Sequence, residues 1–276
     1  DVDLLHSVAL TAPLRTRAVN VVGIADLTWI VAPERDEAAT VRLWRAIVPP
    51  VARRADRIIA PSEATADHIV RYLRVPRERI DVILYAAASE QSEPTAAGEL
   101  RERLELGAGP VVLTVSAKKA NKNLVRLIRA MAPVVHRWPD ARLVMPGNPT
   151  PHERELRSLA ADLGLTENVV FPEYVDAADL EGLYALAGCF VFASVNEGFG
   201  MPILEAMRRG VPVACSRASS LPEVAGDAAR YFDPYDVGDI SGALLDLLSD
   251  TRLAAELGAR GQERERGFTW EANARG

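Results

Sequence analysis

The stretch Glu197-Gly198-Phe199-Gly200-Met201-Pro202-Ile203-Leu204-Glu205 joins a predicted strand to a predicted helix. The apolar run 189–193 before it is short and contains β-branched and aromatic residues, as buried parallel strands do. Pro202 begins an apolar, helix-forming run to Arg209, and proline is favoured at a first helical position. Glu197 is therefore expected in a tight turn at the end of a strand, where open parallel sheets bind ligands.

The two glycines and two glutamates of this stretch suit a phosphorylated ligand. Gly198 and Gly200 allow a sharp turn and a close approach of backbone to ligand. The helix N-terminus behind them offers free N–H groups to a diphosphate. Glu205, near the first turn of this helix, is placed to accept hydrogen bonds from both hydroxyls of a ribose. Taken alone, two glutamates eight residues apart are more often a loop charge and a solvated helix charge.

The composition describes an ordinary globular protein with room for two domains. The chain has 276 residues, 49% hydrophobic and 25% charged, with a net charge of −6 that argues against nucleic acid as a partner. Cys189 and Cys215 fall in predicted strands and are expected to be buried, reduced thiols. No apolar run approaches the ~20 residues of a membrane span, and no secretory signal is present. We expect a cytoplasmic location, with peripheral contact at the inner face of a membrane as the open alternative.

Strands and helices alternate along the whole chain, which predicts an α/β fold with parallel sheets. Residues 1–90 are expected to form a partial Rossmann-like domain, with strands near 18–24, 57–60 and 80–84. Its helices are predicted at 38–48, with a break or kink at Pro49-Pro50, and from a cap at Ser62 to 73. A small, polar linker follows at 86–94. Residues 91–276 are expected to form a second, doubly wound domain whose helix after the first strand opens at Asn121-Lys122-Asn123.

The surrounding sequence carries a family resemblance. After Glu205 come Ala206-Met207-Arg208-Arg209-Gly210-Val211-Pro212-Val213-Ala214, and later Ser219-Ser220-Leu221-Pro222-Glu223-Val224-Ala225-Gly226-Asp227. This pattern resembles the carboxyl-terminal nucleotide-sugar domain of retaining GT-B glycosyltransferases, often called group 1 or family 4. The resemblance runs from about 111 to 250, and more weakly from 4 to 84. It implies a GT-B fold of two Rossmann-like domains, the first incomplete, with a last helix from Phe268 that crosses back to the first domain.

The resemblance also implies a set of site residues. Lys122 and the backbone from Gly198 to Gly200 would hold the donor diphosphate, although position alone favours a solvated surface role for Lys122. Glu197 and Asp26 are the predicted catalytic residues, Glu197 by holding sugar hydroxyls. The predicted donor-binding residues are Ser116, Lys122, Asn123, Gly147, Glu197, Gly198, Phe199, Gly200, Met201, Pro202 and Glu205.

The chain departs from the family pattern at two places. Many relatives carry an arginine in the loop before the lysine, where this chain has Ala117 and Asn121, and Lys118 and Lys119 are the candidate replacements. The histidine that usually precedes the aspartate is replaced by Ala25. His6 is predicted on the acceptor side, with a structural role as the commoner interpretation for such a residue.

The implied reaction is transfer of a hexose from a GDP or UDP sugar, with retention and without a metal or other cofactor. The acceptor would be a carbohydrate or a lipid-linked hydroxyl. The alternative is a non-catalytic nucleotide-sugar-binding subunit or an inactive fragment. We predict no metal site: Asp1-Val2-Asp3 is interpreted as a polar lead-in to a strand, and Glu223 as a helix-dipole carboxylate with a role in the cleft as the secondary alternative. Glu205→Ala is expected to weaken nucleotide binding without unfolding the protein.

Overall fold

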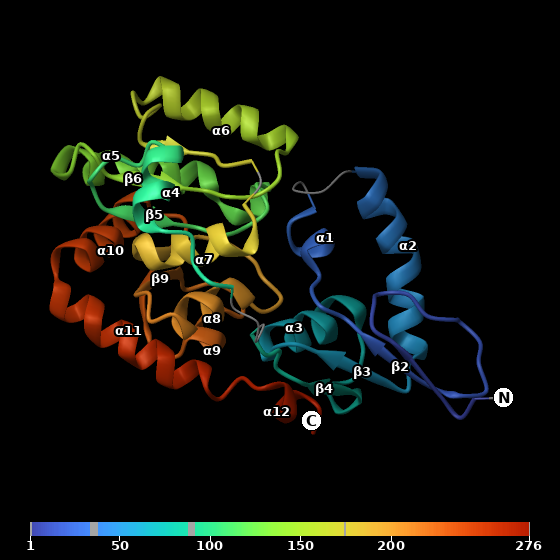
Figure 1. Ribbon diagram of the computed structural model, residues 1–276. Coiled ribbons are helices and arrows are strands. Elements are labelled where there is room, and N and C mark those ends of the chain that lie inside the picture. Colours follow the sequence, from blue (N-terminus) through green and yellow to red (C-terminus); the bar gives the residue numbers. More distant parts are fainter. Residues whose placement is uncertain (1, 34–37, 88–91, 174, 276) are drawn as a thin grey trace.

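The computed structural model describes residues 2–33, 38–87, 92–173 and 175–275. These residues form two α/β halves, the amino-terminal half coloured blue to teal and the carboxyl-terminal half green to red in Figure 1. Each half is built on one parallel sheet, so the predicted α/β GT-B class is confirmed. The predicted boundary at 90/91 lies outside the described residues.

The first sheet has four parallel strands in sequential order, β1-β2-β3-β4. Its strands are β1 (Leu4–Ser7), β2 (Val19–Gly23), β3 (Arg57–Ala60) and β4 (Ile80–Val82). Its helical elements are α1 (Thr28–Val31), α2 (Ala38–Arg54), α3 (Glu63–His68), the π-helical turn η2 (Ile69–Leu73) and the 3₁₀ turn η3 (Arg77–Arg79). Each successive strand is added on the same side of the sheet, whereas a doubly wound sheet has strands on both sides of its first strand.

Two local predictions in this half can be compared with the structure. Ser62 caps α3 as predicted, since its side chain accepts a hydrogen bond from the backbone N–H of Thr65. Of the predicted break or kink at Pro49-Pro50, the break is wrong, because α2 continues through both prolines to Arg54. The prolines lack two helical N–H donors, but buried Val48, Val51 and Ala52 hold this part of the helix in the core.

The second sheet is doubly wound. Its order is β10-β9-β8-β5-β6-β7, so successive strands run outward from β5 on one side and from β8 on the other. The order in which strands are added reverses between the parallel neighbours β5 and β8, and ligands bind at such switch points. The strands are β5 (Val111–Leu113), β6 (Arg142–Val144), β7 (Val169–Val170), β8 (Ala187–Phe192), β9 (Val213–Ser216) and β10 (Ala229–Phe232).

Helices cover both faces of this sheet, and side chains alternate between two cores. On β8, Cys189 and Val191 belong to one core cluster, whereas Phe190 and Phe192 belong to the other. The helical elements are α4 (Ala97–Arg103), η4 (Ala120–Lys122), α5 (Leu124–Arg137), α6 (Pro151–Asp162), α7 (Ala177–Leu186), α8 (Met201–Arg208), α9 (Leu221–Ala225), α10 (Val237–Ser249), α11 (Thr251–Glu265) and α12 (Trp270–Asn273). No helix in the described ranges has the length and apolarity needed to cross a bilayer.

The chain returns to the first half at its end, as the resemblance implies. In Figure 1, α12 lies beside the amino-terminal half, close to β4. The side-chain amide of Asn273 donates a 2.8 Å hydrogen bond to the carbonyl oxygen of Leu84, just after β4. Phe268, which precedes α12, is buried against Phe199 with ring centroids 6.0 Å apart.

Candidate functional site

Lys122 and Glu197 meet at the switch point of the second sheet. Lys122 lies in the 3₁₀ turn η4 after β5, and Glu197 lies in the loop after β8. Lys122 Nζ is 2.5 Å from Glu197 Oε1, and both side chains are less than one-fifth exposed. The backbone N–H of Val195 donates a 3.1 Å hydrogen bond to the carbonyl of Asn121, which ties the two loops together. The ammonium also lies 5.5 Å from the centroid of the Phe192 ring.

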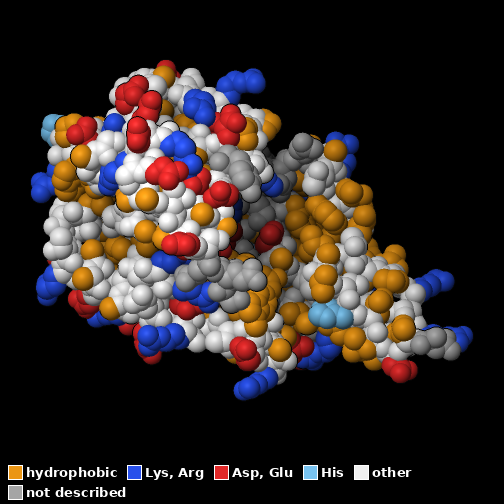
Figure 2. All heavy atoms as spheres, viewed as in Figure 1, with side chains coloured by type: hydrophobic (Ala, Val, Ile, Leu, Met, Phe, Trp, Pro, Cys, Tyr) orange, Lys and Arg blue, Asp and Glu red, His pale blue; other side chains and the backbone are white. Residues whose placement is uncertain are grey.

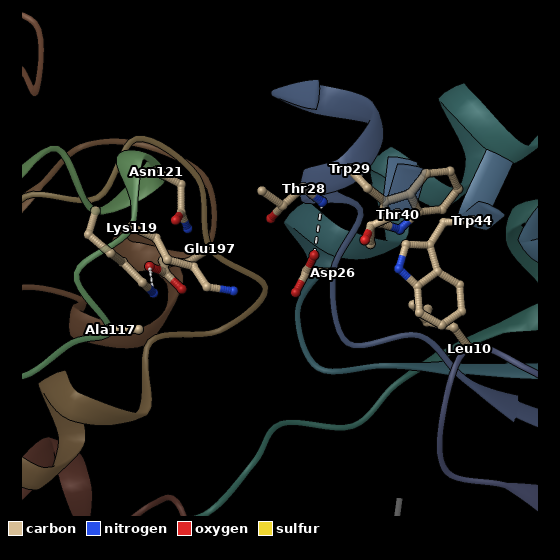
Figure 3. Close-up of a pocket in the computed structure, with 11 residues that line it drawn as sticks. Leu10, Asp26, Thr28, Trp29, Thr40, Trp44, Ala117, Lys119, Asn121 and Glu197 are labelled. Carbon is tan, nitrogen blue, oxygen red and sulfur yellow. Dashed lines mark hydrogen bonds and ion pairs between the residues drawn. The ribbon is translucent and has the colours of Figure 1, made fainter. Parts of the chain in front are cut away.

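Two cavities open beside this ion pair, with volumes of about 420 and 330 Å³. The larger lies between the two halves: Figure 3 shows Glu197, Lys119, Asn121 and Ala117 on one side and Asp26, Thr28, Trp29, Thr40, Trp44 and Leu10 on the other. Figure 2 shows the surface hollowed between the halves. Both cavities are lined by Asp26, Ala117, Lys122 and Glu197. The polar groups of both domains therefore converge on one region.

The loop 197–200 forms a wall of the smaller cavity, and glycine is needed at its two glycine positions for different structural reasons. Gly200 is the N-cap of α8 and has φ +117°, a conformation that favours glycine. At Gly198 a Cβ would stand only 1.9 Å from the carbonyl oxygen of Ala25. Gly198 therefore packs against the backbone of the other domain; it also lines the smaller cavity, and its predicted approach to a ligand stays a prediction. Ser62 Oγ donates a 2.6 Å hydrogen bond to the carbonyl of Gly198.

The other predicted residues of this loop divide into lining and packing positions. Ser116, Met201 and Pro202 line the smaller cavity with Glu197. Phe199 also lines this cavity, but it is 4% exposed and packs edge-on against Tyr85, with ring centroids 5.4 Å apart. Its side chain thus serves mainly the core.

Glu205 lies further along α8 and has an internal partner. The hydroxyl of Tyr184 donates a 3.0 Å hydrogen bond to Glu205 Oε2. Burial, followed by the negative charge of Glu205, raises the pKa of Tyr184 well above its ordinary value. Arg209 pairs with Glu181 and lies 4.5 Å from the centroid of the Tyr184 ring. This network fixes the Glu205 side chain, whose role in ribose binding stays a prediction.

Two residues near Lys122 are used for structure. Asn123 is buried in the left-handed conformation at φ 58°, and its amide donates to the carbonyls of Ala193 and Pro234 at 3.1 and 2.7 Å. The helix predicted to open at 121–123 is α5, whose N-cap is Asn123, and the residues before this cap form the 3₁₀ turn η4. Lys118 is 1% exposed, lies 3.1 Å from Glu153 Oε2 and donates to the carbonyl of Gly147.

These contacts remove Lys118 as the replacement for the family arginine, because its charge is already paired in the interior. Gly147 has φ +136° and supplies this carbonyl, so its role in donor binding stays a prediction. Lys119 is exposed and lines the larger cavity. It is the cation of this loop that faces the space between the domains.

The amino-terminal wall contains Asp26 but not His6. Asp26 Oδ1 accepts a 2.8 Å hydrogen bond from the backbone N–H of Thr28, and Ala25 lines the smaller cavity. His6 is exposed on β1, away from the residues that line either cavity. The structure therefore brings Asp26, Lys122 and Glu197 together but leaves His6 apart.

Glu223 contacts the other domain as well as its own helix. Both carboxylate oxygens accept hydrogen bonds at 3.0 Å from the backbone N–H of Glu63, the first residue of α3. Across the same boundary, Asn196 Nδ2 donates to Thr28 Oγ1 at 3.1 Å. The interpretation of Glu223 as a carboxylate on its own helix dipole is thus incomplete, because it satisfies a helix terminus in the opposite half.

Sequence reasoning missed three aromatic cavity residues, Trp29, Trp44 and Tyr85. Trp29 and Trp44 fit helical or core patterns. The one sequence signal for a place in the cavity is that they follow the strand that ends near Gly23. Burial followed by the charge of Asp26 raises the pKa of Tyr85. Among the described residues, no group of three or more His, Cys, Asp or Glu is arranged to hold a metal ion. Cys189 and Cys215 are buried free thiols.

Comparison with known proteins places this arrangement in context. The family model "Glycosyl transferases group 1" matches residues 98–264, and the model "Glycosyltransferase Family 4" matches residues 1–84. O-antigen chain mannosyltransferase B of Escherichia coli is 32% identical over 253 residues, which cover 89% of this chain and 65% of that protein. A GDP-mannose-dependent alpha-(1-6)-phosphatidylinositol monomannoside mannosyltransferase of Mycolicibacterium smegmatis is 33% identical over 231 residues, covering 77% and 60%.

Solved structures show the same fold. Sucrose-phosphate synthase from Thermosynechococcus elongatus superposes with a TM-score of 0.78 at 24% identity, covering 94% of this chain and 66% of that one. Anabaena HepE in complex with UDP and glucose gives a TM-score of 0.79 at 22% identity, covering 94% and 70%. The chain thus spans less than two-thirds of the length of the two mannosyltransferases named above.

Proposed function

We propose that this chain, which belongs to the group 1 glycosyltransferase family, binds a nucleoside-diphosphate sugar and transfers its hexose to an acceptor hydroxyl. The observation that supports this most is the Lys122–Glu197 pair at the switch point, opposite Asp26 of the other domain. The mannosyltransferase relatives favour a hexose donor, with GDP or UDP as the predicted base. A lipid-linked acceptor, a cytoplasmic location and membrane contact stay predictions.

The chemistry proposed for the pair begins with an exchange of partners. In the structure the ammonium of Lys122 pairs with the carboxylate of Glu197. An entering diphosphate offers Lys122 stronger anionic oxygens, and the N-terminus of α8 adds its free N–H groups. Glu197 is then released to accept hydrogen bonds from sugar hydroxyls. Fixed positive groups at the diphosphate stabilise the charge that grows on the leaving nucleotide.

Retention of configuration and independence of a metal or other cofactor are further parts of the proposal. Retention is supported by the family resemblance, and NMR of the product anomer tests it. Metal independence predicts transfer rates that EDTA leaves unchanged. The alternative of a binding subunit without catalysis is favoured by Ala25, which lines the smaller cavity where the resemblance expects a histidine.

The deciding experiment measures binding and turnover separately. GDP and UDP are titrated by calorimetry into the wild type, Lys122→Met, Glu197→Gln and the control Glu256→Gln, which lies on the exposed face of α11. Loss of a charge-assisted contact predicts a roughly 10- to 100-fold weaker affinity for Lys122→Met. Glu197→Gln should keep nucleotide affinity but lose nucleotide release from the sugar donor. Equal affinities in all four proteins, or no binding of either nucleotide, would refute the proposal.

A further inference from the structure

Hydroxyl groups hold two carbonyls of the loop 197–200, which lines the smaller cavity. Ser219 Oγ donates a 2.6 Å hydrogen bond to the carbonyl oxygen of Glu197. Ser220, which is fully buried, donates from its Oγ to the carbonyl oxygen of Phe199 at 2.7 Å. Both serines directly precede α9, in the same domain as the loop. These two peptide groups are therefore fixed from within the carboxyl-terminal domain.

The carbonyl between these two belongs to Gly198 and is held from the other domain. It accepts hydrogen bonds from Ser62 Oγ at 2.6 Å and from Thr65 Oγ1 at 3.2 Å. Both side chains are buried at the N-terminus of α3, which Figure 1 shows at the boundary between the halves. Ser62 Oγ is also 3.1 Å from Thr65 Oγ1, but a hydroxyl has one proton, and the Gly198 oxygen is the nearer acceptor. Both lone pairs of this carbonyl thus have donors in the amino-terminal domain.

With its carbonyls held, the loop has N–H groups as its remaining backbone polar groups. The described peptide bonds are trans, so each C=O and the N–H of the next residue point in opposite directions. The N–H groups of Gly198, Phe199 and Gly200 therefore point away from the hydroxyls that hold the preceding carbonyls. Among the described residues, none of these three N–H groups has a protein acceptor. Because successive N–H groups bind anions, their orientation towards a phosphate depends on these hydroxyls.

We infer that Ser62 and Thr65 are positioning residues for the donor diphosphate. This inference rests on the proposed function, in which the diphosphate binds at Lys122 and the N-terminus of α8. Ser62 and Thr65 line neither cavity of the site, so they act through the loop. Their hydroxyls fix the peptide group that joins Gly198 to Phe199, and so they aim the N–H of Phe199. The amino-terminal domain therefore regulates donor affinity through α3, without these two side chains touching the nucleotide.

Thr65→Val and Thr65→Ser are a matched pair for the test. Valine keeps the shape of threonine without the hydroxyl, whereas serine keeps the hydroxyl. Whichever of GDP and UDP binds the wild type is titrated by calorimetry, together with its monophosphate. Loss of one hydrogen bond predicts a roughly fivefold weaker diphosphate affinity in Thr65→Val, and Thr65→Ser should match the wild type. The monophosphate affinity should change in neither variant, because a loss of folded protein alone would weaken both ligands alike.

Ser62→Ala and an NMR titration extend the test. Ser62→Ala should lower the ratio of diphosphate to monophosphate affinity, but it also removes the cap of α3. Its control is Asp250→Ala, which removes a cap hydrogen bond from α11 and should leave the ratio unchanged. In amide NMR spectra, inorganic pyrophosphate should shift the signal of Phe199 in the wild type and in Thr65→Ser. This shift should be smaller in Thr65→Val.

The outcomes separate this inference from the proposed function. If a nucleotide binds but Thr65→Val keeps the wild-type ratio of affinities, the positioning role is refuted alone. An equal loss of both ligands in Thr65→Val also refutes it, in favour of a purely structural role. If neither nucleotide binds the wild type, the proposed function fails, and the pyrophosphate spectra still decide. Equal shifts of Phe199 in Thr65→Val and Thr65→Ser, or no shift in the wild type, would then overturn the positioning role.

Discussion

Replacing Gly198 by alanine is expected to force the two domains apart. A Cβ at this position would stand 1.9 Å from the oxygen and 2.9 Å from the carbon of the Ala25 carbonyl, which are backbone atoms with no rotamer to change. Overpacking of this kind costs about 1–3 kcal/mol. The displacement also weakens the hydrogen bonds from Ser62 and Thr65 to the Gly198 carbonyl, worth about 1 kcal/mol each. We therefore expect the interdomain contact to lose about 3 kcal/mol.

Urea unfolding and small-angle scattering measure this effect, with Gly242→Ala as the control. Gly242 lies in α10, where an added Cβ meets nothing within 4 Å, and a helical glycine-to-alanine change stabilises by about 0.5–1 kcal/mol. Gly198→Ala should lower the urea midpoint and enlarge the radius of gyration, whereas Gly242→Ala should do neither. If Gly198→Ala keeps the wild-type midpoint and radius, the Gly198–Ala25 contact does not hold the domains together.

Two further substitutions test contacts inside the second domain. Glu205→Ala should weaken GDP or UDP binding in calorimetry. It should also lower the free energy of unfolding in urea by about 1–3 kcal/mol, because the buried Tyr184 hydroxyl loses its acceptor. Adding Tyr184→Phe to this variant should recover most of the lost stability, and no recovery would contradict this explanation. Although burial by itself raises the pKa of Glu153, hydrogen bonds and charges from Arg157 and Lys118 hold that pKa below its ordinary value. The stability from Glu153 is thus present above the unfolded pKa of about 4.3 and lost as the pH falls through the lower folded value. Glu153→Gln should cost about 3 kcal/mol at pH 7, with the difference from wild type narrowing below pH 4 in urea unfolding; a pH-independent difference would contradict the assignment.

Patterns with a strong local cause were predictable from the sequence. The turn at Glu197 follows from an apolar strand, two glycines and a proline, and the structure has β8, a left-handed Gly200 and α8 in that order. The Ser62 cap follows likewise from one side chain and the helix it precedes. The contact of Glu205 with Tyr184, which lies on a different helix, was not foreseen; the expectation that Glu205→Ala does not unfold the protein stays a prediction.

Features that depend on distant parts of the chain were not predictable in this way. Lys118 has the appearance of a loop cation, and only the placement of Glu153 on α6 makes it an interior one. Gly198 was predicted only as a ligand-facing glycine, and its contact with Ala25 of the other domain could not be foreseen from the local sequence. Asn123 adopts a left-handed conformation because two backbone carbonyls, of Ala193 and Pro234, satisfy its amide. In each case tertiary contact overrides a local pattern.

The position of the ion pair at the switch point also affects how the protein reaches its native state. Lys122 and Glu197 are 75 residues apart in the chain, and they become neighbours only when β8 pairs with β5. Contacts of such large sequence separation form slowly, because closing a long loop costs chain entropy before any pairing repays it. We therefore expect the donor site to be assembled late, after the local β5–β6 and β8–β9 units. A substitution that slows the pairing of β5 with β8 should delay the recovery of nucleotide binding during refolding as much as the recovery of the fold.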